Sequence, residues 1–136
     1  MSIETVKHPL GHISRYHFRI WDGRRMRYSW EPGLVICPAP IGHPDRGALV
    51  GGIEASPGVQ LFELPPMQCS GLIDFNGNSV FESDLIKYKN EVLTVEFDPY
   101  EACFIAAVDE DQDPRFLSSV VAEASLVGNI HEGPTQ

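Results

Sequence analysis

The dipeptide Asn76-Gly77 most constrains how this chain can fold. Asn-Gly between two apolar runs is the strongest short-range signal for a β-hairpin, because both residues tolerate positive φ angles. A two-residue loop here pairs Ile73 with Val80 and places apolar side chains on both faces. The hairpin over residues 67–87 is therefore expected to be central and well covered.

A second hairpin is predicted over residues 13–30, where apolar and basic side chains alternate on either side of Asp22-Gly23. A three-residue loop, residues 22–24, pairs Ile20 with Met26 and brings the apolar side chains to one face. Burial of one face favours this register over that of a two-residue loop.

In this register Arg19 faces Arg27 across the pair, and like charges in such positions repel. The basic side chains and Trp21 then share the other face, which is expected to be solvated. It is alternatively an anion site or a dock for the chain's own acidic segment. The arginines and the tryptophan of this candidate surface are Arg15, Arg19, Trp21, Arg25 and Arg27.

Further short elements follow along the chain. A two-residue turn at Asn90-Glu91 pairs Tyr88 with Leu93 and Ile86 with Val95 in a third hairpin. The other face of this hairpin then carries Lys87, Lys89, Thr94 and Glu96. Asp113-Pro114 predicts an N-cap and first position for a short helix over residues 115–123. Consecutive short strands joined by tight turns predict an all-β antiparallel meander that closes into a small barrel or sandwich.

Residues 31–66 have a different character, because they hold seven of the eleven prolines. Proline removes a backbone donor, so this segment is expected to be irregular, except for short strands over residues 34–37 and 59–64. At 136 residues the chain is predicted to be one domain, with residues 1–12 as an extension and residues 131–136 as a tail.

The net charge of −9 is unevenly distributed. Residues 82–136 carry twelve acidic residues against Lys87, Lys89 and Arg115, which disfavours duplex DNA as a partner. No signal peptide or membrane span is recognisable, and three widely spaced cysteines argue against disulfides, so a cytoplasmic location is expected. A second candidate binding surface is the acidic loop formed by Asp109, Glu110, Asp111 and Asp113.

No catalytic constellation stands out, and no cofactor or metal is expected. Glu82 and Asp84 lie two residues apart and would share a strand face, which suits metal-assisted hydrolysis. Acidic residues after a hairpin more often cap turns, however. His8 and His12 have helical zinc spacing, but Pro9 and Gly11 between them exclude a helix.

Three blocks together identify a family resemblance. They are Phe18-Arg19-Ile20-Trp21-Asp22, the long block from Met67-Gln68-Cys69-Ser70-Gly71-Leu72 through Asn76-Gly77 to Phe81-Glu82-Ser83-Asp84, and Val127-Gly128-Asn129-Ile130-His131-Glu132. In this order they resemble the YopX family of phage and prophage proteins. One departure is Ser83, which stands where the family has glycine.

The resemblance implies an all-β domain with a small SH3-like barrel core, encoded by mobile elements, and it implies no activity. We therefore expect a non-catalytic interaction module that binds a host or phage protein, or its own copies. Binding of nucleic acid or a nucleotide through the first hairpin is the alternative, with Trp21 stacking on a base. Metal-assisted hydrolysis ranks third.

Overall fold

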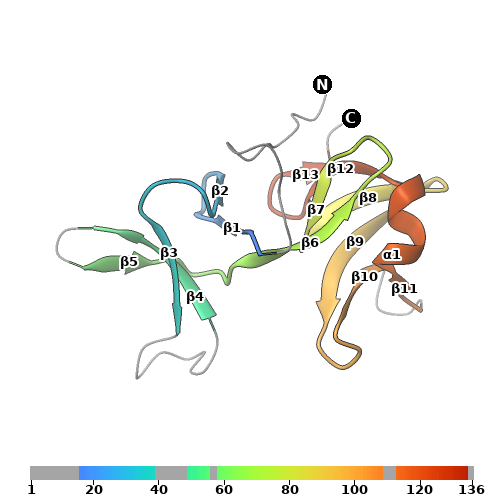
Figure 1. Cartoon of the computed structure of the whole chain (residues 1–136). Helices are drawn as coiled ribbons and strands as arrows, with labels where there is room; N and C mark the ends of the chain where they lie inside the picture. The colour runs from blue at the N-terminus through green and yellow to red at the C-terminus, as the bar shows by residue number, and fades with distance from the viewer. Residues whose placement is uncertain (1–15, 39–48, 56–57, 109–112, 135–136) are drawn as a thin grey trace. The chain divides into compact units, whose positions relative to one another are not determined.

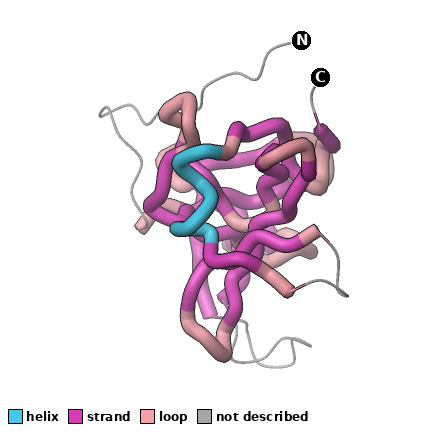
Figure 2. Tube along the Cα trace, turned by 90° about the vertical axis from the view of Figure 1, so that its right-hand side faces the viewer, coloured by secondary structure: helices cyan, strands magenta, loops and turns pink. Residues whose placement is uncertain are grey.

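The computed structural model describes residues 16–38, 49–55, 58–108 and 113–134. They form short antiparallel strands and one short helical segment (Figures 1 and 2), which confirms the all-β prediction. Residue contacts divide the chain into two compact units, His17–Gln68 and Cys69–Gln136. We call them the N-terminal unit and the C-terminal unit.

The N-terminal unit contains two small groups of strands. In the first, β1 (Phe18–Trp21) pairs with β2 (Met26–Tyr28) and with the first two residues of β6 (Met67–Ile73). The second is a three-stranded sheet in the order β3, β4, β5, whose strands are Leu34–Pro38, Leu49–Glu54 and Val59–Leu61.

Strand β4 corrects the prediction that residues 31–66 lack regular structure beyond two short strands. Strand β4 is difficult to predict from the sequence because it contains Gly51 and Gly52, and glycine is a poor strand former. The structure explains Gly51 by packing: a Cβ there would lie 2.0 Å from Cδ1 of the fully buried Ile20. Strand β3 lies where it is predicted, and β5 begins at the predicted residue but ends at Leu61, three residues early.

The C-terminal unit is built on a six-stranded antiparallel sheet in the order β11, β10, β9, β8, β12, β13. Strand β7 (Ser79–Phe81) pairs with β6 outside this sheet. A single helical turn, α1 (Leu117–Val120), continues into a 3-10 turn (Val121–Glu123). The strands of the sheet are β8 (Asp84–Tyr88), β9 (Glu91–Asp98), β10 (Cys103–Ala107), β11 (Arg115–Phe116), β12 (Ser125–Asn129) and β13 (Gly133–Pro134).

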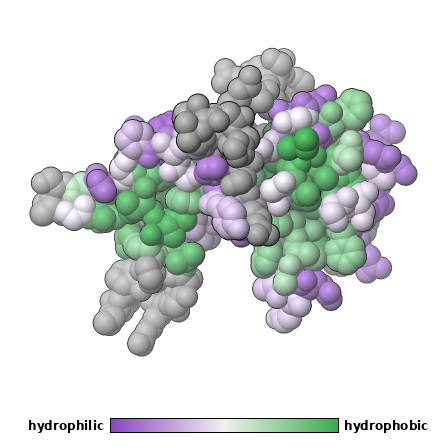
Figure 3. All heavy atoms as spheres, in the orientation of Figure 1, coloured by the Kyte–Doolittle hydropathy of each residue, from purple (hydrophilic) through white to green (hydrophobic). Residues whose placement is uncertain are grey.

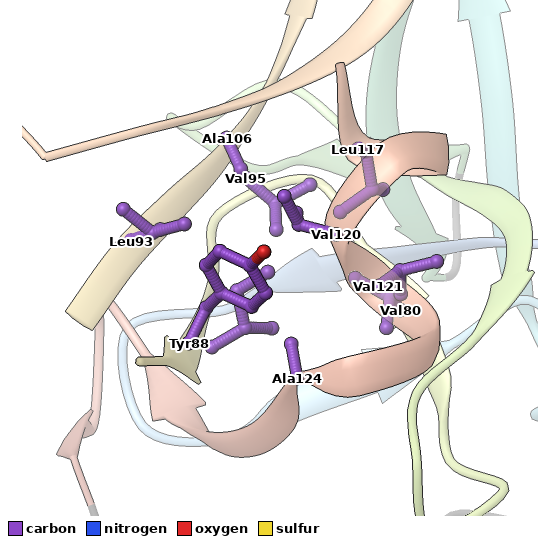
Figure 4. Close-up of a cluster of buried hydrophobic side chains, with 10 residues drawn as sticks. Val80, Tyr88, Leu93, Val95, Ala106, Leu117, Val120, Val121 and Ala124 are labelled. Carbon is purple, nitrogen blue, oxygen red and sulfur yellow. The ribbon is translucent and has the colours of Figure 1, made fainter. Parts of the chain in front are cut away.

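One face of this sheet holds the hydrophobic core (Figure 4). Alternate residues of β8, β9 and β10 point to it, and the two helical turns pack on them. We call this the inner face of the sheet. The buried core residues are Val80, Ile86, Tyr88, Leu93, Val95, Ala106, Leu117, Val120, Val121 and Ala124.

The helix start differs from the prediction. The residue that caps α1 is Phe116, with no side-chain hydrogen bond, so Asp113 does not cap it and Pro114 is not its first residue. Arg115 and Phe116 instead pair with β10 as a two-residue strand. The predicted tail also contains a strand, β13, which pairs with β12.

The first hairpin has a loop one residue longer than predicted. Trp21 pairs with Met26 and Ile20 with Arg27, so the loop comprises residues 22–25. The carboxylate of Asp22 explains this length, because its Oδ1 accepts hydrogen bonds from the backbone N–H of Arg24 at 2.7 Å and of Arg25 at 2.9 Å. This Asx turn draws Arg25 into the loop.

The Asn-Gly hairpin is altered by an aspartate in the same way. Oδ1 of Asp74 accepts from the backbone N–H groups of Asn76 and Asn78, so Ile73 pairs with Ser79 and not with Val80. The coverage is also uneven, since Val80 is fully buried whereas Ile73 is 58% exposed. The predicted two-residue loop is therefore wrong, and the hairpin is well covered at Val80 but not at Ile73.

The third hairpin forms with its turn shifted by one residue. Tyr88 pairs with Glu91, and the turn residues are Lys89 and Asn90, with φ angles of 47° and 68°. The predicted division of faces survives this shift, because Ile86 still pairs with an apolar residue, Leu93, on the inner face.

We expect Ser83→Gly to stabilise the C-terminal unit by about 0.5–1 kcal/mol. Ser83 has φ 70° in the turn before β8. At this φ a residue with a Cβ is strained by roughly 1–2 kcal/mol, and glycine removes this strain. Glycine also loses more conformational entropy on folding, which offsets part of the gain. Denaturant unfolding of the full chain measures the gain. Ser83→Ala keeps the Cβ and should gain nothing, and an equal gain in both variants would contradict this explanation.

Candidate functional site

The predicted basic face of the first hairpin does not form as expected. Arg19 pairs with Tyr28, not with Arg27, and is only 4% exposed. Arg15 lies outside the described residues. The longer loop also moves Trp21 to the face that carries Met26, because a shift of one residue exchanges the faces of a strand.

Two other arginines of the candidate surface bind carboxylates, one in the loop of the same hairpin and one just after β2. Arg27 donates from Nε to Oδ2 of Asp22, and Arg25 forms a bidentate pair with Glu31 at 3.0 and 3.1 Å. Partial burial opposes ionisation of Asp22. Its backbone hydrogen bonds and Arg27 nevertheless outweigh this effect and lower the pKa from 3.8 to about 2.

The pair of Arg25 and Glu31 also covers the outer edge of β2. Glu31 accepts from the N–H of Tyr28 at 3.3 Å and donates its own N–H to the carbonyl of Tyr28 at 2.8 Å. Arg25 donates to the carbonyl of Met26 at 3.4 Å. Because these bonds occupy the backbone N–H and C=O groups at the free edge of β2, they prevent another strand from pairing there.

An aromatic surface on this hairpin was missed in the sequence. Tyr28 stacks on Trp30 with ring centroids 5.0 Å apart, and His17 meets Trp30 edge-on at 5.5 Å. All three side chains are partly exposed. The alternation of residues can indicate that these aromatic side chains lie together at the surface, but only when the correct loop length is known.

Two buried carboxylates of the C-terminal unit, that of the candidate Asp84 and that of Asp74, hold the backbone in place. Asp84 is 1% exposed and accepts from the N–H of Phe81 at 2.7 Å. Asp74 is 3% exposed and accepts from the N–H groups of Asn76, Asn78 and Leu126 at 2.7–2.9 Å. In the part of the chain that the structure describes, no three acidic, histidine or cysteine side chains are grouped to hold a metal.

The acidic loop is described only at its end. Asp113 is exposed, whereas Asp109, Glu110 and Asp111 lie outside the described residues.

Both units carry hydrophobic residues at the surface, as Figure 3 shows. Within the described ranges, no helix has the length and apolar character needed to cross a membrane.

One of these apolar regions is the outer face of the six-stranded sheet. Strand pairing aligns Leu85, Thr94 and Ala107 in one row, and Ile105 and Phe116 beside Glu96 in the next. Both described helical turns lie on the inner face. We define the outer face by Leu85, Lys87, Val92, Thr94, Glu96, Asp98, Ile105, Ala107 and Phe116.

Exposure on the outer face is substantial. Phe116 is 54% and Val92 44% exposed, and the residues between them are partly exposed. An antiparallel sheet packed on one side normally presents polar residues on the other. The apolar composition of this exposed face is typical of an interaction surface. The buried carboxylates of Asp74 and Asp84, by contrast, hold the backbone in place.

Comparison with known proteins places the chain in one family. The family model "YopX protein" matches residues 46–136. The solved structure of the YopX protein from Bacillus subtilis superimposes with a TM-score of 0.57 at 16% identity, covering 88% of this chain and 95% of that one. This likeness shows a shared fold. No curated protein matches the chain. By its family match, this chain is a member of the YopX family.

Proposed function

We propose that this protein is a non-catalytic binding module of a phage or prophage type, which contacts another protein chain through the outer face. The single observation that carries the proposal is the apolar composition of a sheet face whose opposite side already packs the core. Burying such a face gains roughly 25 cal/mol for each Å² of apolar surface.

The engagement of the polar side chains supports binding rather than catalysis. A catalytic carboxylate needs access to substrate, whereas Asp74 and Asp84 are nearly fully buried and hydrogen-bonded to backbone. This argues against metal-assisted hydrolysis through Glu82 and Asp84, because the carboxylate of Asp84 is buried and bonded to the backbone N–H of Phe81.

Binding of nucleic acid or a nucleotide draws support from the aromatic surface of Tyr28 and Trp30, since bases stack on such rings. The ion pairs of Arg25 and Arg27 count against it, because these cations already have carboxylate partners. Contact between proteins is therefore the better-supported proposal.

A photo-crosslinking amino acid at Phe116 tests this proposal in cells that contain the natural partners. Because Phe116 is 54% exposed and aromatic, benzoylphenylalanine should fit there without disturbing the fold. We expect a discrete crosslinked protein band.

The matched control is the same amino acid at Tyr100, which is 96% exposed in the turn between β9 and β10 and lies outside the outer face. It should give no such band. No crosslink from Phe116, or the same products from both sites, would overturn the proposal.

A further inference from the structure

The charges of the outer face are arranged in a self-complementary way. Among the described residues, the face carries one cation, Lys87, in the row of Val92, and two anions toward its other end, Glu96 in the row of Ile105 and Asp98 one row further along β9. Four residues of β9 separate the rows of Lys87 and Glu96, or roughly 13 Å along the strand. The row through Thr94, which is uncharged, lies midway between them.

Two such faces can pack on each other with their charges matched. The two copies would be related by a two-fold axis. This axis lies in the plane of the interface, runs perpendicular to the strands and passes through the row of Thr94. It reverses the strand direction of the second copy relative to the first. The end with Lys87 then lies over the end with Glu96 of the second copy, and the apolar residues between them meet. Closed dimers commonly use such self-complementary faces.

We propose that the outer face binds a second copy of this chain, face to face around this axis. The proposal rests on the proposed function, because it names the partner of the same surface. A strongly basic or acidic partner would fit only one end of the face, since it would repel either Lys87 or Glu96. A second copy satisfies both ends at once.

Sedimentation equilibrium of the full chain, in about 0.15 M salt to screen the remote acidic residues, tests the proposal. We expect a monomer–dimer equilibrium with a dissociation constant in about the micromolar range, given the limited area of four short strands. Lys87→Glu and Glu96→Lys should each weaken the dimer by about tenfold, because each places two like-charged pairs in the interface.

The double variant Lys87→Glu/Glu96→Lys should restore the dissociation constant to within about threefold of the natural chain, because the pairs re-form with reversed sign. The matched control is Lys89→Glu/Glu91→Lys, which makes the same charge changes at the turn between β8 and β9. It should leave the equilibrium unchanged. Circular dichroism establishes that each variant folds.

A natural chain that stays monomeric up to about 0.2 mM, well above that range, would overturn the inference. So would a dimer that Lys87→Glu and Glu96→Lys leave intact. If the chain is monomeric while a different protein crosslinks to Phe116, this inference fails and the proposed function stands. If neither association occurs, both fail.

Discussion

Asp74→Ala is expected to destabilise the C-terminal unit by about 3–5 kcal/mol. The carboxylate accepts four hydrogen bonds, and the N–H of Leu126 reaches it at 2.7 Å from 52 residues away. Hydrogen bonds to a charged group contribute roughly 1.5–3 kcal/mol each, and the alanine variant leaves partly buried donors without this acceptor. Denaturant unfolding monitored by circular dichroism measures the loss.

The matched control is Asp98→Ala. Asp98 also caps a turn, accepting from the N–H groups of Tyr100 and Glu101 at 2.9 and 3.4 Å, but these bonds are exposed and local. We expect a cost of less than about 1 kcal/mol there, because water replaces the lost bonds. Similar costs at Asp74 and Asp98 would show that the contact with β12 contributes little.

Gly128→Ala should have the second-largest effect, a loss of about 2–4 kcal/mol. Gly128 sits at a bulge in β12 with φ 149°, which side chains rarely adopt. A Cβ would lie 2.2 Å from the carbonyl oxygen of Gly133, so β13 would have to move away. The two costs, backbone strain and overpacking, are each roughly 1–3 kcal/mol. The midpoint and slope of denaturant unfolding measure their sum.

Gly133→Ala separates the two costs. Gly133 also has a positive φ, 81°, but nothing lies within 4 Å of its Cβ position. We expect only the conformational cost there, about 1 kcal/mol. If both alanine variants lose the same stability, the close approach of β13 to Gly128 is not what requires glycine.

The sequence predicted much of the scaffold and little of the candidate surface. Alternation in β8 and β9 correctly separated an apolar inner face from a face with Lys87 and Glu96. The turns were found near their Asn, Asp and Gly residues. The outer face was not recognised, because its residues come from four strands and each contributes only one or two apolar positions.

The basic candidate surface depended on an assumed loop length. One extra residue in the loop of Asp22 moved Arg19 opposite Tyr28 and left Arg25 and Arg27 with acidic partners. The acidic partners were visible in the sequence, but their pairing with particular arginines follows from the register. A sequence pattern alone therefore overstated the free positive charge of this hairpin.

By itself, the sequence determined that the chain forms short antiparallel strands, where most of its turns fall, and which family block it carries. These properties depend on local backbone preferences and on alternation over a few residues. The tertiary structure decided the registers, the strand at Gly51 and the apolar outer face. The reason is physical: Asp22 and Asp74 set loop lengths by binding backbone N–H groups, and a one-residue change exchanges the faces of a strand. The Asn-Gly signal located the central hairpin, but Asp74, through its bonds to the N–H groups of Asn76 and Asn78, decided how that hairpin pairs, and its bond to Leu126 ties the hairpin to β12.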